Sequence, residues 1–279
     1  MLLRSPYVPA HGENRMAHEG DVVNARRHFT LAAPRNLQFL IQHRYEWMNA
    51  HIPADGVGIE VGCGSGLSKN YIRAKSYRLT DFAAHPWIDD KRVDALATPF
   101  GDGAFDFVVS SNMIHHVPYP VRFFAEMGRI LKPGGVLLVQ EINASFAMRG
   151  LLRLMRHEGY SYAANVFDAD EICTDPNDLW SANCAIPNLL FDDPARFHEH
   201  IPYFHIESDR HREFLNFINS GGVIAKTRSV PLPRLGLWAC KKIDDALTWA
   251  APGAFALQRQ LVLKKVAAVP AAHQLRRAA

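Results

Sequence analysis

GIEVGCGSG, residues 58–66, places four glycines and one carboxylate between an apolar run and a helix-like run. VGIEV (57–61) is typical of a short buried strand, and LSKNYIRA (67–74) predicts a helix. Glycine adopts left-handed backbone and has no Cβ to keep a ligand at a distance. A helix N-terminus also offers free N–H groups to an anion. The turn between the two elements therefore predicts a site for a small charged ligand.

The rest of the chain alternates short apolar runs with helical patterns. Strands that are apolar throughout indicate a parallel sheet covered on both faces, and right-handed crossovers then give a doubly wound arrangement. We therefore expect an α/β, Rossmann-like, mostly parallel seven-stranded sheet. The expected strands are 57–61, 76–82, 92–96, 105–112, 136–142, 203–207 and 255–266. The expected helices are 36–49, 67–74, 120–131, 148–160 and 212–222.

The alternation stops between 143 and about 200, where we expect a helical insertion that forms a lid over the substrate. It resumes afterwards, so the last strands should complete the sheet. The predicted divisions are an N-terminal arm that is loosely attached (1–35), a cofactor-binding core (36–142), the lid (143–200), the C-terminal part of the core (201–266) and a tail (267–279).

Composition narrows the class of protein. The 279 residues are 48% hydrophobic and 21% charged, with a formal net charge of +3, as in an ordinary globular protein. Lys and Arg are not clustered as a polyanion-binding surface requires, so nucleic acid is not an expected partner. The four cysteines form no CxxC pair, which is against a zinc knuckle or a disulfide framework and favours a reduced, cytoplasmic chain. No signal peptide and no membrane-spanning run are predicted.

The glycine spacing distinguishes between two kinds of cofactor. A dinucleotide fingerprint reads G-x-G-x-x-G, whereas this turn reads G-x-G-x-G and has Leu67 where the third glycine would stand. The spacing is therefore against an oxidoreductase that uses a nicotinamide cofactor. The E-x-G-x-G-x-G stretch instead resembles the first motif of class I S-adenosylmethionine-dependent methyltransferases.

Four further stretches resemble the same family in order and spacing, so that the resemblance covers residues 57–142 and is closest to the subgroup called methyltransferase type 11. They are SYRLTDF (76–82), VDALATPFGDGAFDFVV (93–109), SSNMIHHV (110–117) and RILKPGGVLLV (129–139). The resemblance implies S-adenosylmethionine as cofactor and S-adenosylhomocysteine as product. It implies that Asp81 binds the ribose hydroxyls, Asp94 the adenine amino group and the Ala95 backbone a ring nitrogen. The implied cofactor-binding set is Glu60, Gly62, Cys63, Gly64, Gly66, Asp81, Phe82, Asp94, Ala95 and Asn112.

One segment departs from the family pattern. AAHPWIDDKR (83–92) stands where the family has a full helix, and it contains Pro86. We expect this helix to be lost or to be one turn long. Trp87 or Ile88 would then cover the adenine, although Trp87 could equally pack against the sheet edge alone.

Methyl transfer from a sulfonium needs alignment of donor and acceptor and exclusion of water, and it requires no metal. A hydroxyl acceptor also needs a base, commonly histidine. His115 and His116 follow the fourth strand and are the candidates, with His157 as a weaker one beside Glu158. The alternative is that one ring bonds the backbone while the other packs under the lid, and that residues 157–158 are an exposed pair at a helix end.

These observations predict a methyltransferase for a small organic acceptor, with O-methylation of a sugar, lipid-linked or secondary-metabolite compound as the expected reaction. SSNMIHH stands after the fourth strand in place of an N-P-P-Y-type motif, which is against methylation of DNA bases or glutamine. Two alternatives stay open: a nicotinamide-dependent oxidoreductase, and a non-catalytic partner that keeps the fold. The intact set of Glu60, the glycines, Asp81 and Asp94 is against the second.

Overall fold

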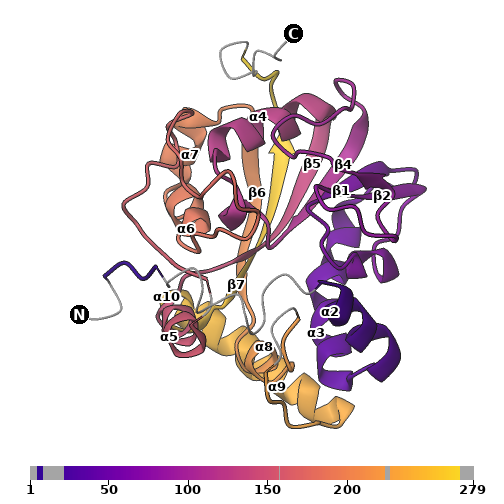
Figure 1. Cartoon of the computed structure of the whole chain (residues 1–279), viewed down its shortest axis with the longest axis vertical. Coiled ribbons are helices and arrows are strands. Elements are labelled where there is room, and N and C mark those ends of the chain that lie inside the picture. The colour runs from indigo at the N-terminus through magenta and orange to yellow at the C-terminus, as the bar shows by residue number, and fades with distance from the viewer. Residues whose placement is uncertain (1–4, 9–21, 157, 224–226, 271–279) are drawn as a thin grey trace.

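A computed structural model describes residues 5–8, 22–156, 158–223 and 227–270. A seven-stranded sheet forms the middle layer, in the order β3-β2-β1-β4-β5-β7-β6 (Figure 1). Neighbours from β3 to β5 are parallel, whereas β7 runs antiparallel to both β5 and β6. The predicted Rossmann-like sheet is thus confirmed. The strands are β1 Val57–Val61, β2 Ser76–Asp81, β3 Asp90–Lys91, β4 Phe105–Ser111, β5 Leu131–Ile142, β6 Phe204–Arg212 and β7 Gln258–Lys265.

Helices cover both faces of the sheet, as buried apolar strands require. Phe107 and Val108 are neighbours on β4, and because side chains alternate along a strand they enter different cores. Val108 packs in the core that includes residues of α4, α6 and α7, and Phe107 in the core with α3 and η3. These helices are α3 Arg35–Tyr45, η3 Glu46–His51, α4 Pro120–Ile130, α6 Ile186–Phe191 and α7 Pro194–His200.

A third group of helices gathers beyond the carboxyl end of β5 (Figure 1). It consists of α5 Phe146–Met155, α8 Leu215–Ile218, α9 Arg234–Ala250 and α10 Pro252–Phe255. The Asn143 side chain, just after β5, donates to the Ala256 carbonyl at 2.8 Å. Arg44 of α3 forms a buried ion pair with Glu213, at 2.7 Å, and so joins α3 to the chain between β6 and α8.

The elements on either side of β2 are shorter than the sequence predicts. The helix expected at 67–74 is one 3₁₀ turn, η4 Leu67–Asn70, which ends where Tyr71 N–H and Ile72 N–H both donate to the Ser68 carbonyl. The strand expected at 92–96 is β3, which begins two residues earlier and ends at Lys91, before Arg92 with a φ of 59°. As predicted, no helix forms between Phe82 and Asp89.

Elements after β5 also differ from expectation. The helix expected at 148–160 is α5, which begins at the Ser145 cap and ends at Arg156 with a φ of 50°. Most of the helix expected at 212–222 is absent, because β6 continues to Arg212 and α8 is a single turn. The 17-residue helix α9 is not predicted, since its apolar side chains lie on several sides and blur the helical period.

The N-terminal segment is attached more firmly than expected over its described residues. Helix α2 (Val22–Arg27) and the π-helical turn η2 (His28–Ala32) bury Val22 and Phe29. Nearer the terminus, the backbone of Tyr7 exchanges two hydrogen bonds with that of Tyr160, at 2.9 and 2.8 Å. The described parts of this segment therefore belong to the packed structure.

Glu60 lies at the centre of a buried polar network between β1, η4 and β2. One carboxylate oxygen accepts a short hydrogen bond from the Ser68 hydroxyl and another from the Tyr77 hydroxyl at 3.0 Å. Burial raises the pKa of the Glu60 carboxyl to about 7, although these two hydrogen bonds act in the opposite direction. The folded protein therefore favours a protonated Glu60 more than the unfolded chain does.

This shift predicts a pH dependence of stability. Because the folded pKa lies above the ordinary 4.5, the contribution of Glu60 is fully present below pH 4.5 and is lost as the pH rises through 7. Over this window the free energy of unfolding of the wild type should fall by about 3 kcal/mol relative to Glu60→Gln. Urea unfolding of both proteins at several pH values measures the difference.

Glu171→Gln is the matched control, because Glu171 is exposed. Its stability should follow that of the wild type at every pH. Parallel curves for the wild type and Glu60→Gln would show that Glu60 is not the titrating group.

Candidate functional site

The glycine turn after β1 adopts a backbone that its glycines make possible. Gly62, Gly64 and Gly66 have φ angles of 63°, 50° and 63°, in the region that side chains disfavour. A Cβ on Gly62 would lie 2.4 Å from Met113 Cγ, and one on Gly66 would lie 2.9 Å from Trp87 Cδ1. Two of the glycines are thus required by packing as well as by conformation.

Of the three glycines of this turn, Gly64 has the most space around it within the described part of the chain. Among the described residues, a Cβ there would meet only Val22 Cγ1, at 3.8 Å. Asp81, the last residue of β2, accepts a hydrogen bond from Gly64 N–H at 2.8 Å and another from Ala83 N–H at 2.8 Å. Each carboxylate oxygen keeps a second lone pair. The open side of the turn therefore has a carboxylate that can still accept hydroxyl groups.

Trp87 lies directly against this turn rather than at a remote sheet edge. Its indole N–H donates to the Gly64 carbonyl at 2.9 Å. His85 stacks on the ring at a centroid distance of 4.7 Å, and the Arg26 guanidinium lies 5.0 Å from the ring centroid. Arg26 also donates to the Ser65 carbonyl at 2.7 Å. Helix α2 is thus fixed beside the turn, a contact that no sequence motif indicated.

The other residues implied to bind the cofactor lie at the same edge of the sheet but differ in exposure. Phe82 and Asp94 are exposed, and Ala95 is half-buried. The Asp94 carboxylate accepts from Leu96 N–H at 2.8 Å and so shapes a tight turn after β3. Asn112, just after β4, has a φ of 50°, which asparagine tolerates better than most residues.

Glu60 and Cys63 are buried and are therefore part of the support of the turn. The Glu60 carboxylate accepts from Ser68 and Tyr77, and Cys63 N–H donates to the Thr80 carbonyl at 3.1 Å. Burial, together with the charge of Glu60, raises the pKa of the Cys63 thiol well above its usual range. These contacts favour a positioning role for both residues.

A second group of side chains gathers where β4 and β5 end. Glu141 is fully buried, and its carboxylate accepts from Met113 N–H at 3.0 Å and from Ile114 N–H at 2.7 Å. It also accepts from His115 Nδ1 at 2.5 Å and from Ile142 N–H at 2.7 Å. One carboxylate thus fixes both the turn after β4 and the orientation of the His115 ring.

His116 lies beside His115, with ring centroids 4.2 Å apart. Its Nδ1 donates to the Ser181 carbonyl at 3.0 Å. The Nε2 atoms of His115 and His116 both face Glu158, at 3.4 Å from Oε2 and 3.6 Å from Oε1. The structure therefore brings the two predicted histidines together with one carboxylate from beyond α5.

The two rings have opposite electrostatic environments. Burial acts to lower the pKa of His115, but Glu141 and Glu158 outweigh it and raise the value to about 10. Burial and the neighbouring His115 lower the pKa of His116, and Glu158 opposes this only in part. His116 is thus the ring of the pair that stays neutral more readily.

The expected lid is in contact with this histidine pair. Asn183 N–H donates to the His115 carbonyl at 2.8 Å, and the Thr174 hydroxyl donates to the His116 carbonyl at 2.8 Å. Trp180 meets the His116 ring edge-on, with centroids 6.1 Å apart. These contacts leave the His115 side chain only 3% exposed and that of His116 16%.

Sequence reasoning found only part of this cluster. Glu158 was named only as the neighbour of His157, and His157 itself lies outside the described residues. Glu141 lies within a predicted strand (136–142), and no motif distinguishes it. The available signal is a carboxylate one residue before the end of a mostly apolar strand, VLLVQEI (136–142), which is the same position that Glu60 holds in VGIEV.

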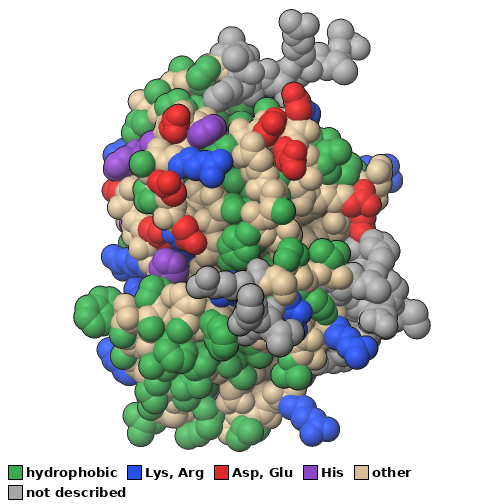
Figure 2. All heavy atoms as spheres, turned by 90° about the vertical axis from the view of Figure 1, so that its left-hand side faces the viewer, with side chains coloured by type: hydrophobic (Ala, Val, Ile, Leu, Met, Phe, Trp, Pro, Cys, Tyr) green, Lys and Arg blue, Asp and Glu red, His purple; other side chains and the backbone are tan. Residues whose placement is uncertain are grey.

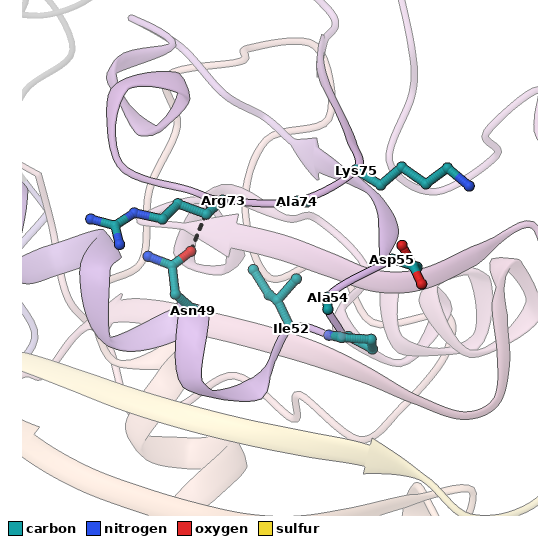
Figure 3. A pocket seen from close by; sticks show the side chains of 8 residues that line it. Asn49, Ile52, Ala54, Asp55, Arg73, Ala74 and Lys75 are labelled. Atoms are coloured by element: carbon teal, nitrogen blue, oxygen red, sulfur yellow. Dashed lines mark hydrogen bonds between the residues drawn. The ribbon is translucent and has the colours of Figure 1, made fainter.

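A separate hollow is lined by Asn49, Ile52, Pro53, Ala54, Asp55, Arg73, Ala74 and Lys75 (Figure 3). These residues precede β1 and β2, so the hollow lies at the amino ends of the strands. Open α/β sheets bind ligands at the opposite edge. The glycine turn and the histidine cluster are therefore the candidate site. Among the described residues, no helix is both long and apolar enough to cross a membrane.

Comparison with known proteins agrees with this geometry. A family model described as a methyltransferase domain matches residues 32–211. An uncharacterized methyltransferase of Mycobacterium leprae is 30% identical over 159 residues, which are 44% of this chain and 58% of that protein. The chloroplastic tocopherol O-methyltransferase of Arabidopsis thaliana is 32% identical over 99 residues, which are 29% of this chain and 28% of that protein.

A solved structure from Thermotoga maritima, described as a possible histamine N-methyltransferase, shares the fold. It has a TM-score of 0.50 and 15% identity, with 88% of this chain and 96% of that chain covered. The curated relatives above are matched over 58% and 28% of their own length. The matched family is a methyltransferase family and not a nicotinamide-dependent one. The chain belongs to the methyltransferase-domain family and is a class I S-adenosylmethionine-dependent methyltransferase.

Proposed function

We propose that this enzyme transfers a methyl group from S-adenosylmethionine to a hydroxyl group of a small, largely apolar acceptor. The observation that carries the proposal is the burial of the His115–His116 pair beneath the segment 158–186. A nucleic acid or a folded protein could not bring a group to side chains enclosed in this way, whereas a small acceptor can enter beneath the segment. Residues 143–200 then act as the lid.

The cofactor would bind along the edge formed by the glycine turn and the end of β2. The open side of Gly64 leaves room for a ligand, and the Asp81 carboxylate beside it is suited to the ribose hydroxyls. The edge of the Trp87 ring and the exposed Phe82 would provide apolar surface for the adenine, with Asp94 and Ala95 on the next turn. When bound, S-adenosylmethionine supplies an electrophilic methyl group on a sulfonium.

Two observations support an apolar acceptor. Among the similar proteins is a tocopherol O-methyltransferase, whose named compound dissolves in lipid. Figure 2 shows hydrophobic side chains gathered on the lower part of one face, where α5 lies. Phe146, Leu154 and Met155 of α5 are exposed there, and α10 joins α5 to α9, which exposes Trp249. Exposed apolar patches commonly mark binding or membrane-contact surfaces, so an acceptor carried by lipid fits this face.

The cofactor assignment predicts the effect of removing the Asp81 carboxylate. Asp81→Ala should weaken the binding of S-adenosylmethionine and S-adenosylhomocysteine by about 1.5–3 kcal/mol, since charge-assisted hydrogen bonds to the ribose are lost. Isothermal titration calorimetry with both compounds measures the change, and NAD should not bind the wild type. Asp55→Ala is the control, because Asp55 is exposed at the far edge of the sheet.

Asp81→Asn separates two effects of the first variant. The amide oxygen can still accept from one turn N–H, so this protein should keep the fold of the turn while losing the charge. Unchanged affinity in both variants, with the fold retained, would contradict the ribose assignment.

The acceptor assignment predicts that the histidine pair affects turnover and not cofactor binding. His116→Asn should slow methyl transfer at least tenfold, because His116 lies in the enclosed cluster that would activate the hydroxyl, and should leave the affinity for S-adenosylmethionine within twofold. Transfer of labelled methyl groups to a panel of apolar hydroxylated ring compounds measures the rate. His205→Asn, on an exposed part of β6, is the control, and equal rates in all three proteins would rule out the role of His116.

A further inference from the structure

The two Nε2 atoms of the histidine pair converge on the Glu158 carboxylate. The separations are 3.4 Å for His115 and 3.6 Å for His116. All three side chains are positioned so that one ligand atom of each lies within 4.8 Å of the others. The cluster is at the end of β4, at the edge of the sheet where this fold binds its ligands.

The Nδ1 atom of each histidine ring already forms a hydrogen bond. His115 Nδ1 bonds the Glu141 carboxylate, and His116 Nδ1 bonds the Ser181 carbonyl. A carboxylate and a carbonyl accept hydrogen bonds, so each Nδ1 carries a proton. Metal binding requires each Nε2 to release any proton that it holds, and Nε2 then presents a lone pair. Histidines that bind a metal through one ring nitrogen commonly donate the N–H of the other to a carboxylate or a carbonyl, which orients the ring.

A lone pair that faces a carboxylate oxygen is unfavourable unless something positive lies between them. In a neutral His116 ring, the Nε2 lone pair faces Glu158 Oε1. A proton on Nε2 would relieve this, and so would a metal ion. The observed separations also fit the second case, because ligand atoms at about 2.0–2.1 Å from a tetrahedral Zn²⁺ lie about 3.3 Å apart.

We propose that His115, His116 and Glu158 form a binding site for a divalent cation, with Zn²⁺ as the preferred ion. Two imidazoles and one carboxylate are the protein ligands of a catalytic zinc site that keeps a fourth position open. The sequence motifs did not predict a metal ion. The three ligands come together only where the segment 158–186 contacts the turn after β4.

The fourth coordination position of the ion could bind the hydroxyl group of the acceptor. This role rests on the proposed function. An acceptor hydroxyl bound there would lose its proton more readily, because a metal ion stabilises the oxygen anion. The proton passes to solvent, the oxygen forms a bond to the methyl carbon, and the carbon–sulfur bond of the sulfonium breaks with its electrons kept by sulfur. The charges balance without an oxidant or a reductant.

The test uses Co²⁺ as a spectroscopic substitute for Zn²⁺ in the full chain. Protein treated with a chelator should bind one equivalent of Co²⁺ with visible absorption bands of a tetrahedral site, and Zn²⁺ should displace it. Glu158→Gln should weaken Co²⁺ affinity at least tenfold, since the amide is a poor ligand. Glu171→Gln, which changes an exposed glutamate of the same lid, should bind like the wild type.

His116→Asn provides a second variant in case Glu158→Gln does not fold, and it should also lose tight binding. Absence of saturable Co²⁺ and Zn²⁺ binding by the wild type would overturn the metal site, as would unchanged affinity in a folded Glu158→Gln protein. Calorimetry with S-adenosylmethionine separates the two proposals. Methyl transfer by metal-free protein would overturn the cation site alone, whereas Co²⁺ binding without cofactor binding would overturn the proposed function alone.

Discussion

The carboxylate of Glu141 is the interaction on which the arrangement of the site depends. It is fully buried at the end of β5, where it accepts three backbone N–H groups and the Nδ1 proton of His115. A buried charge is stable only when it is hydrogen-bonded in this manner. Because β4 and β5 are paired in register, Val109 opposite Leu138 and Ser111 opposite Gln140, the end of one strand fixes the turn after its neighbour. The orientation of the histidine ring therefore follows from the register of the sheet.

The segment 158–186 is hydrogen-bonded to the turn after β4. Asn183 N–H, Thr174 and the Ser181 carbonyl bond either the backbone or the ring of the histidine pair. Asn183 and Ser181 use backbone atoms, whereas Thr174 uses its side-chain hydroxyl, so the position of this segment depends only in part on its own side chains. The Glu158 side chain reaches into the cluster and meets both Nε2 atoms. A change in how the lid sits would move this carboxylate and the two rings relative to one another.

The features of the fold that are local in sequence could be predicted from it. The glycine spacing, the apolar strands and the missing helix at 83–92 depend on neighbouring residues, and the structure agrees with each. The helix predicted at 67–74 is only one turn long, and beyond it the Tyr71 carbonyl accepts a hydrogen bond from the Asn49 side-chain amide at 2.9 Å instead of one from a next helical turn. The positions of Glu141 and Arg26 in the site could not be predicted, for a different reason. Their contacts join segments far apart in sequence, such as Arg26 with Ser65. A local pattern of apolar residues does not indicate such contacts.

Carboxylates accept backbone N–H groups at two places along the carboxyl edge of the sheet. Turns that leave the carboxyl ends of parallel strands expose backbone N–H groups that the sheet cannot satisfy. Here carboxylates at strand ends accept them: Asp81 takes Gly64 N–H, and Glu141 takes Met113 and Ile114 N–H. Each bond crosses from one strand to the turn of its neighbour, so the edge is tied together laterally by charge-assisted hydrogen bonds, which are stronger than neutral ones. The residues that make the edge rigid are thus of the same chemical kind as those that bind hydroxyl groups and cations. The same carboxylates can therefore hold the edge together and still have oxygen lone pairs that face away from the turns.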